Sequence, residues 1–101
     1  MAAAGDYGKP RLAVVVQANV LNEADPPSVI VALMTGTVRE APFLRLTLSP
    51  TPENGLPKPS QIMVDKLAAI RPDKITSPVG RLTGQQLLAL NRLLALVIGL
   101  A

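Results

Sequence analysis

Apolar residues gather in short runs separated by turn-forming residues, a pattern typical of a small β-rich protein. Residues 11–18 (RLAVVVQA) contain three consecutive β-branched valines and predict a buried strand, and residues 28–35 (SVIVALMT) predict a second one. In residues 43–50 (FLRLTLSP), apolar and polar side chains nearly alternate, which predicts a half-exposed antiparallel strand. The first half of the chain is therefore expected to supply three strands.

The second half predicts two more strands with a short helical turn between them. Residues 61–70 (QIMVDKLAAI) are largely apolar, with a polar break at Asp65 and Lys66. Proline favours the first position of a helix, so RPDKI is expected to hold one helical turn that begins at Pro72. Residues 77–82 (SPVGRL) are expected to return as a last short strand.

The carboxyl-terminal residues predict a helix that is apolar on more than one side. Thr83 and Gln86 have the spacing of a capping box, and Gly99 is a suitable residue to close the helix, which we expect over residues 84–98. One stripe of the helix holds Leu87, Leu90, Leu94 and Val97, and outside this stripe lie Leu88, Leu93, Leu96 and Ile98. Because apolar residues beyond one stripe need a second contact, we expect a homodimer that pairs through this helix region.

Proline-rich and polar stretches predict the loops, namely residues 22–27, 36–42 and 49–60. The last contains four prolines and the turn dipeptide Asn54-Gly55. With 101 residues and no internal repeat, the chain is expected to form one domain over residues 1–101. Five short strands and one terminal helix predict a small, strongly bent antiparallel sheet or half-open barrel with the helix packed against it.

Composition narrows the chemistry. The chain has no cysteine and no histidine, which excludes a thiolate nucleophile, the usual zinc sites and the commonest acid–base group. We expect no metal and no other cofactor. A formal charge of +3 suits a polyanion or an acidic protein as partner. Only Tyr7 and Phe43 are aromatic, so base stacking is not expected to be the main mode of recognition.

Neither end of the chain predicts a membrane segment. The opening residues, MAAAGDYGKP, lack the apolar stretch of a signal peptide, so a cytoplasmic location is expected. The apolar carboxyl end is not expected to span a membrane, because polar side chains interrupt it. These side chains are Gln85, Gln86, Asn91 and Arg92.

Four segments, in this order, carry a resemblance to a known family: GDYGKPRLAVVVQ, SVIVALMT, GLPKPSQIMVDKL and VGRLTGQQLLALNRLLALVIGL. Along nearly its whole length the chain resembles the PemK/MazF toxins of type II toxin–antitoxin systems. The resemblance implies an SH3-like (CcdB/MazF-like) barrel with a carboxyl-terminal helix, a homodimer, a cognate antitoxin as partner, and metal-independent, sequence-selective cleavage of single-stranded RNA. Family members normally open with an Arg-Gly-Asp or Arg-Gly-Glu strand, and because MAAAGDYG has no such motif, we expect the first strand to be missing.

The same resemblance indicates the site. Arg11 matches the family's loop arginine, and Thr35 matches the threonine that closes the second strand, the two groups to which RNA cleavage is attributed. Leu12 stands where proline is usual. Cleavage through the 2′-hydroxyl of RNA needs proton transfer and positive charge on the phosphate. Arg11 would bind the phosphate, and Thr35 would hold a phosphate oxygen or orient the 2′-hydroxyl, although a threonine at this position also simply ends a strand.

Further RNA contacts are predicted at Lys9, Arg39 and Lys66, whose charges would track phosphates. Lys66 stands where glutamine is common in the family. Tyr7 is equally compatible with stacking on a base and with packing on the barrel rim. Lys58 is interpreted as an ordinary solvated surface residue.

Two other functions remain open. A CcdB-like toxin would share the barrel but act on DNA gyrase, and the helix end VIGLA would then carry the activity. A truncated homologue without the first strand would only dimerise and bind antitoxin. Loss of RNA cleavage in Arg11→Ala, with the fold retained, would favour the endoribonuclease.

Overall fold

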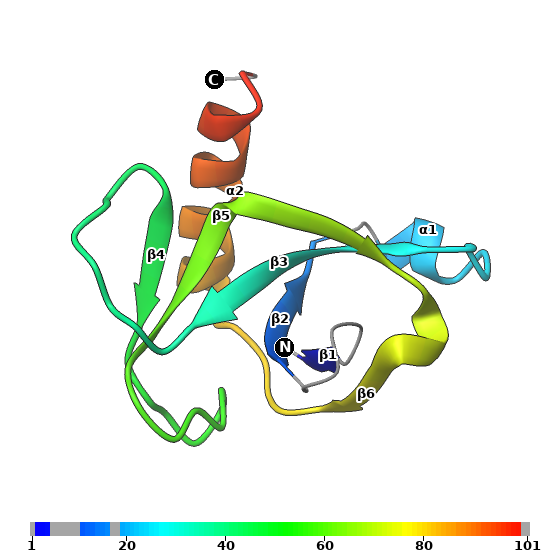
Figure 1. Cartoon of the computed structure of the whole chain (residues 1–101), viewed down its shortest axis with the longest axis horizontal. Coiled ribbons are helices and arrows are strands. Elements are labelled where there is room, and N and C mark those ends of the chain that lie inside the picture. Colours follow the sequence, from blue (N-terminus) through cyan, green and yellow to red (C-terminus); the bar gives the residue numbers. More distant parts are fainter. Residues whose placement is uncertain (1, 5–10, 17–18, 100–101) are drawn as a thin grey trace.

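The computed structural model describes residues 2–4, 11–16 and 19–99, which form one six-stranded sheet flanked by helices (Figure 1). The elements are β1 Ala2–Ala4, β2 Arg11–Val15, α1 Asn19–Asn22, β3 Val29–Thr35, β4 Arg45–Leu48, β5 Ser60–Ile70, η1 Pro72–Lys74, β6 Ile75–Pro78 and α2 Gly84–Val97. The strand order is β4-β5-β3-β2-β1-β6, and each neighbouring pair is antiparallel. The sheet is strongly curled but does not close between its edge strands β4 and β6, so the predicted half-open barrel with a terminal helix is confirmed.

The curl is sharpest along β5, where the pairing with β3 changes register. Ala32 pairs with Leu67, whereas Met34 pairs with Ile62, so one residue of β3 faces four residues of β5. Extra residues on one strand bend it and increase its twist. The predicted polar break at Asp65 falls inside this bulge. As a result, β5 runs beside β4 at its start and along the far end of β3 at its finish (Figure 1).

The curled sheet is buried on both faces, which explains the nearly continuous apolar runs of its central strands. Successive residues of a strand point to opposite faces. One buried cluster contains Val14, Ala32, Met34, Leu48, Leu56, Ile62, Val64, Leu82 and Leu90. The other contains Ala13, Val29, Val31 and Ile70. Helix α2 packs against the first cluster, on β4 and β5.

Helix α2 begins and ends as its sequence predicts. The amide of Gln86 donates to the Thr83 hydroxyl at 3.1 Å, and the amide of Thr83 donates to the Gln86 side-chain oxygen at 2.9 Å, so the capping box is confirmed. Gly99 follows the helix with φ of 81°. Leu90 is buried, but Leu87, which we expected on the same stripe, is 45% exposed. The packed face instead turns toward Leu93, because leucines on nearly every side leave the periodicity ambiguous.

A strand does precede the glycine-containing loop, so the expectation of a missing first strand is wrong. β1 pairs with β2 through Ala2 with Ala13 and Ala4 with Arg11, and on its other side it pairs with β6. Three alanines carry little strand propensity. Backbone hydrogen bonds to β2 on one side and β6 on the other hold this strand, although its side chains do not favour one.

The last strand and one short helix also differ from the expectations. The last strand comes at Ile75–Pro78 rather than at residues 77–82, because the chain after Pro78 crosses over the loop of residues 49–60, where the amide of Arg81 donates to the carbonyl of Glu53 at 3.0 Å. The four-residue helix α1 was not expected. A single turn of that length is too short to show an apolar period.

The loop of residues 49–60 is built around the fully buried side chain of Asn54. Its side-chain oxygen accepts from the amides of Thr51 and Leu56, both at 3.0 Å, and its side-chain nitrogen donates to the carbonyl of Ser49 at 2.8 Å. Gly55 follows with φ of 65°, a left-handed conformation that favours glycine. The predicted Asn-Gly turn is therefore also the internal support of the loop.

Candidate functional site

Residues from neighbouring strands line up in one polar row across the sheet. Thr35 of β3 pairs with Gln61 of β5, which pairs with Thr47 of β4. The register of β2 with β3 joins Ala13 to Leu33, and continuing it places position 11 opposite position 35. Cross-strand partners lie on the same face of a sheet. We call Arg11, Thr35, Gln61 and Thr47 the polar row, with Arg11 placed by its backbone.

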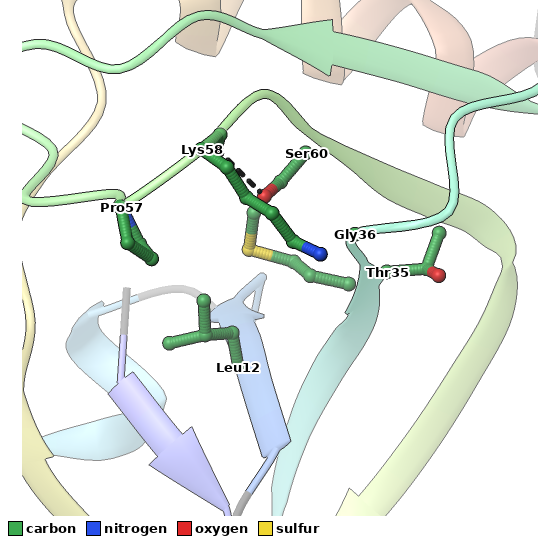
Figure 2. Close-up of a pocket in the computed structure, with 7 residues that line it drawn as sticks. Leu12, Thr35, Gly36, Pro57, Lys58 and Ser60 are labelled. Atoms are coloured by element: carbon green, nitrogen blue, oxygen red, sulfur yellow. Dashed lines mark hydrogen bonds between the residues drawn. The ribbon is translucent and has the colours of Figure 1, made fainter.

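Thr35 ends β3 with its hydroxyl partly engaged. The Thr35 oxygen accepts a hydrogen bond from the amide of Thr37 at 3.1 Å. Figure 2 shows this hydroxyl directed away from Lys58 and Ser60. A hydroxyl has one donor and two acceptor positions. Thr35 therefore keeps its proton and one acceptor position for a further partner.

Gln61 is the fixed centre of the polar row. Its side chain is 3% exposed and uses its whole hydrogen-bonding capacity. The side-chain nitrogen donates to the carbonyl of Arg39 at 2.7 Å and to the hydroxyl of Thr47 at 3.0 Å. The side-chain oxygen accepts from the amide of Arg39 at 3.0 Å and from Nη1 of Arg45 at 3.1 Å. Gln61 thus holds the loop of residues 36–42 by both backbone groups of one residue.

Two guanidinium groups border a small cavity beside this row. It measures about 170 Å³ and is lined by Arg39, Glu40, Ala41, Pro42, Arg45, Thr47 and Gln61. We call it the arginine pocket. Nη1 of Arg45 also donates to the carbonyl of Thr37 at 3.0 Å, so this guanidinium connects the pocket to the segment that follows Thr35. The pocket combines two guanidinium groups, of which that of Arg45 is held by hydrogen bonds, with one carboxylate.

A larger cleft of about 270 Å³ is lined by Leu12, Met34, Thr35, Gly36, Pro57, Lys58 and Ser60 (Figure 2). Lys58 stands between two prolines, and its carbonyl accepts from the Ser60 hydroxyl at 3.1 Å. A Cβ atom at Gly36 would lie 2.8 Å from the Lys58 ammonium, so the lysine chain covers this glycine. We interpreted Lys58 from the sequence as an ordinary solvated surface residue, although the two flanking prolines that restrict its backbone were a usable signal.

The remaining predicted site residues are not gathered at one place. Lys66 lies in the β5 bulge, 57% exposed and 4.0 Å from Asp65, and it lines neither cleft. Arg39 lines the arginine pocket. Tyr7 and Lys9 lie outside the described residues.

Among the described residues, no group of three or more acidic, histidine or cysteine side chains is arranged to hold a metal ion. No helix in this part of the chain has the length and apolar character that crossing a membrane requires.

Comparisons with known proteins place this geometry in context. Residues 1–98 match the family model of the PemK-like, MazF-like toxin of type II toxin-antitoxin systems. The chain is 35% identical over 101 residues to a probable endoribonuclease MazF of Mycolicibacterium smegmatis, covering 99% of this chain and 91% of that protein.

Solved structures share the fold. The Mycobacterium tuberculosis toxin MazF-mt6 superposes with a TM-score of 0.84 at 23% identity, over 99% of this chain and 97% of that one. A mycobacterial endoribonuclease in complex with its cognate antitoxin gives 0.81 at 19% identity, over 99% and 91% of the two chains. The curled sheet with its terminal helix is therefore the fold of these toxins.

Proposed function

Since this chain belongs to the PemK-like, MazF-like family of type II toxins, we propose that it cleaves single-stranded RNA through the RNA's own 2′-hydroxyl, without a metal ion. The observation that carries this proposal is the polar row. Extending the β2–β3 register puts Thr35 opposite position 11, which supports the proposal that an arginine and a hydroxyl from adjacent strands act on one phosphate. A relative of 35% identity is itself named a probable endoribonuclease.

The two residues divide the chemistry between charge and position. In the proposed reaction, the 2′-oxygen attacks the adjacent phosphorus while its proton passes to water. The bond from phosphorus to the 5′-oxygen breaks as that oxygen takes a proton from water, which leaves a 2′,3′-cyclic phosphate and a 5′-hydroxyl. Arg11 binds two phosphate oxygens and stabilises the charge that develops on them. Thr35 uses its remaining donor and acceptor positions to hold a phosphate oxygen or to orient the 2′-hydroxyl. These steps require no bound metal.

The proposal extends to partners and location. We expect a cognate antitoxin whose acidic segment covers the basic surface, since a structural neighbour was solved with its antitoxin. We also expect a cytoplasmic homodimer. Helix α2 supports the dimer, because it exposes apolar side chains that the chain itself leaves uncovered. They are Leu87 at 45%, Leu88 at 51%, Leu96 at 46% and Ile98 at 56% exposure.

The alternative of a truncated, inactive homologue loses its motivation, because it rested on a missing first strand and β1 is present. The gyrase-directed alternative assigns activity to the helix end and not to Arg11. It therefore predicts that substitution of Arg11 leaves toxicity unchanged.

The test is cleavage of a long unstructured RNA in EDTA, with new ends mapped. We expect specific cuts by the wild type. Arg11→Ala should lower the cleavage rate by about 100-fold or more, by analogy with the removal of an oxyanion donor. Thr35→Ala should lower the rate in part, and Thr35→Ser should restore it. Arg71→Ala is the matched control, since Arg71 is an exposed residue immediately before the turn η1 and pairs with Asp73. Intact RNA in every sample, or equal cutting by folded Arg11→Ala, would contradict the proposal.

A further inference from the structure

The arginine pocket lies one strand away from the Thr35 hydroxyl. Gln61, which lines the pocket, is the direct cross-strand partner of Thr35, and Thr47 on the next strand lines it as well. Strands lie about 4.8 Å apart, so Thr47 is about 10 Å from Thr35 along the row. This separation suits a nucleotide that neighbours the cleaved bond rather than the cleaved phosphate itself.

Part of the pocket wall is already ordered by hydrogen bonds within the protein. All four hydrogen bonds of the Gln61 amide are made within the protein, and two of them fix the backbone of Arg39. Arg45 is held by Gln61 and by the carbonyl of Thr37. A site whose walls are already ordered loses less entropy on binding. The backbone of residue 39 is therefore held in one arrangement, and the exposed side chains of Arg39 and Glu40 project from it.

What the pocket presents is a free cation beside a free carboxylate. Within the described residues, the side chains of Arg39 and Glu40 have no hydrogen bond or ion pair, although both line the cavity. A pocket for a phosphate would be weakened by a carboxylate, because like charges repel. A nucleobase is different, since a carboxylate accepts from an amino group while a guanidinium donates to a carbonyl oxygen.

We propose that the arginine pocket binds a guanine or cytosine base next to the cleaved bond and so contributes to the RNA sequence selected. Guanine and cytosine each carry an exocyclic amino group, for Glu40, and a carbonyl oxygen, for Arg39. Adenine lacks the carbonyl and uracil lacks the amino group. This inference rests on the proposed RNA cleavage, and it adds specificity residues to it.

The experiment measures base preference in cleavage and in binding separately. RNAs with each base at the positions flanking a mapped cut are compared for kcat/KM by wild type, Glu40→Ala, and Glu23→Ala, a control on an exposed residue outside the pocket. One good hydrogen-bonded contact discriminates by about 1–3 kcal/mol, so we expect a preference of about 5- to 150-fold for guanine or cytosine at one position. Glu40→Ala should remove this preference while still cutting RNA, and Glu23→Ala should keep it.

Where guanine is the preferred base, its replacement by inosine, whose base lacks the amino group, should lower wild-type cleavage and leave cleavage by Glu40→Ala unaffected. Equal cleavage of all four bases at every flanking position, or an unchanged preference in Glu40→Ala, overturns the inference. A uniform loss for every base in Arg39→Ala, with a weaker salt dependence, would instead make the pocket a phosphate contact.

Binding of the same RNAs to Arg11→Ala separates the two proposals. If Arg11→Ala binds RNA with a base preference but the wild type cuts no RNA, the proposal for the arginine pocket stands and the proposed ribonuclease activity is wrong. Cleavage without any base preference at the flanking positions would do the reverse.

Discussion

Asn54→Ala tests whether the loop of residues 49–60 depends on one buried amide. The substitution removes three hydrogen bonds, to the carbonyl of Ser49 and to the amides of Thr51 and Leu56. Each such bond contributes about 0.5–1.5 kcal/mol net, and an unpaired buried group costs about 1–3 kcal/mol. The bond to Leu56 is buried, whereas the other two are partly buried, so water reaches only some of the abandoned groups.

We therefore expect Asn54→Ala to lower the free energy of unfolding by about 2–4 kcal/mol. A domain of this length has roughly 5–15 kcal/mol in total. Each kcal/mol shifts Tm by about 4–8 °C in a domain of this size, so the melting temperature should fall by roughly 8–30 °C. Urea unfolding followed by circular dichroism measures the loss, with an unchanged slope to show that the transition stays two-state.

The matched control is Asn91→Ala on the exposed side of α2, which should change stability by no more than about 0.5 kcal/mol. If Asn54→Ala shifts the midpoint no further than this control, the buried amide does not support the loop and the reasoning fails.

Two further predictions concern the core and the helix start. Ile62 is fully buried in the first cluster, so Ile62→Ala should leave a cavity and lower the free energy of unfolding by about 2–5 kcal/mol. A loss under about 1 kcal/mol in chemical denaturation would show that the surrounding residues collapse into the cavity. Thr83→Ala removes the bond to the Gln86 amide and should cost about 1 kcal/mol, which Thr83→Ser should largely recover in thermal melts. Equal melting temperatures for Thr83→Ala and wild type would rule out a stabilising cap.

Most of the fold could be predicted from the chain, and the errors have physical causes. The apolar runs at β3 and β5 and the paired signals of Thr83 and Gln86 are strong because burial and capping both demand particular residue types. β1 was missed because its alanines are held by neighbouring backbone and not by their own preference. The exposed face of α2 was misjudged because nearly every side of the helix is apolar.

The site was predictable only in part. Thr35 was predicted through the family resemblance, and extending the β2–β3 register puts it opposite position 11, while its role in cleavage stays a prediction. Gln61 was not singled out, since one glutamine at the start of an apolar strand has no local pattern. Its importance arises from Arg39 and Arg45, which are distant in sequence and meet it only through the strand pairing and the turn of the intervening loop.

The saturated amide of Gln61 has a consequence for how the molecule can change. The amide bonds to the backbone N–H and carbonyl of residue 39, so these two hydrogen bonds do not depend on the side chain at that position. Substitutions at 39 and 40 can therefore alter the chemical character of the pocket wall while its shape is inherited unchanged. In the proposed pocket, the backbone of the loop and the side chains that contact the base can therefore change independently, so that a new RNA target requires no refolding.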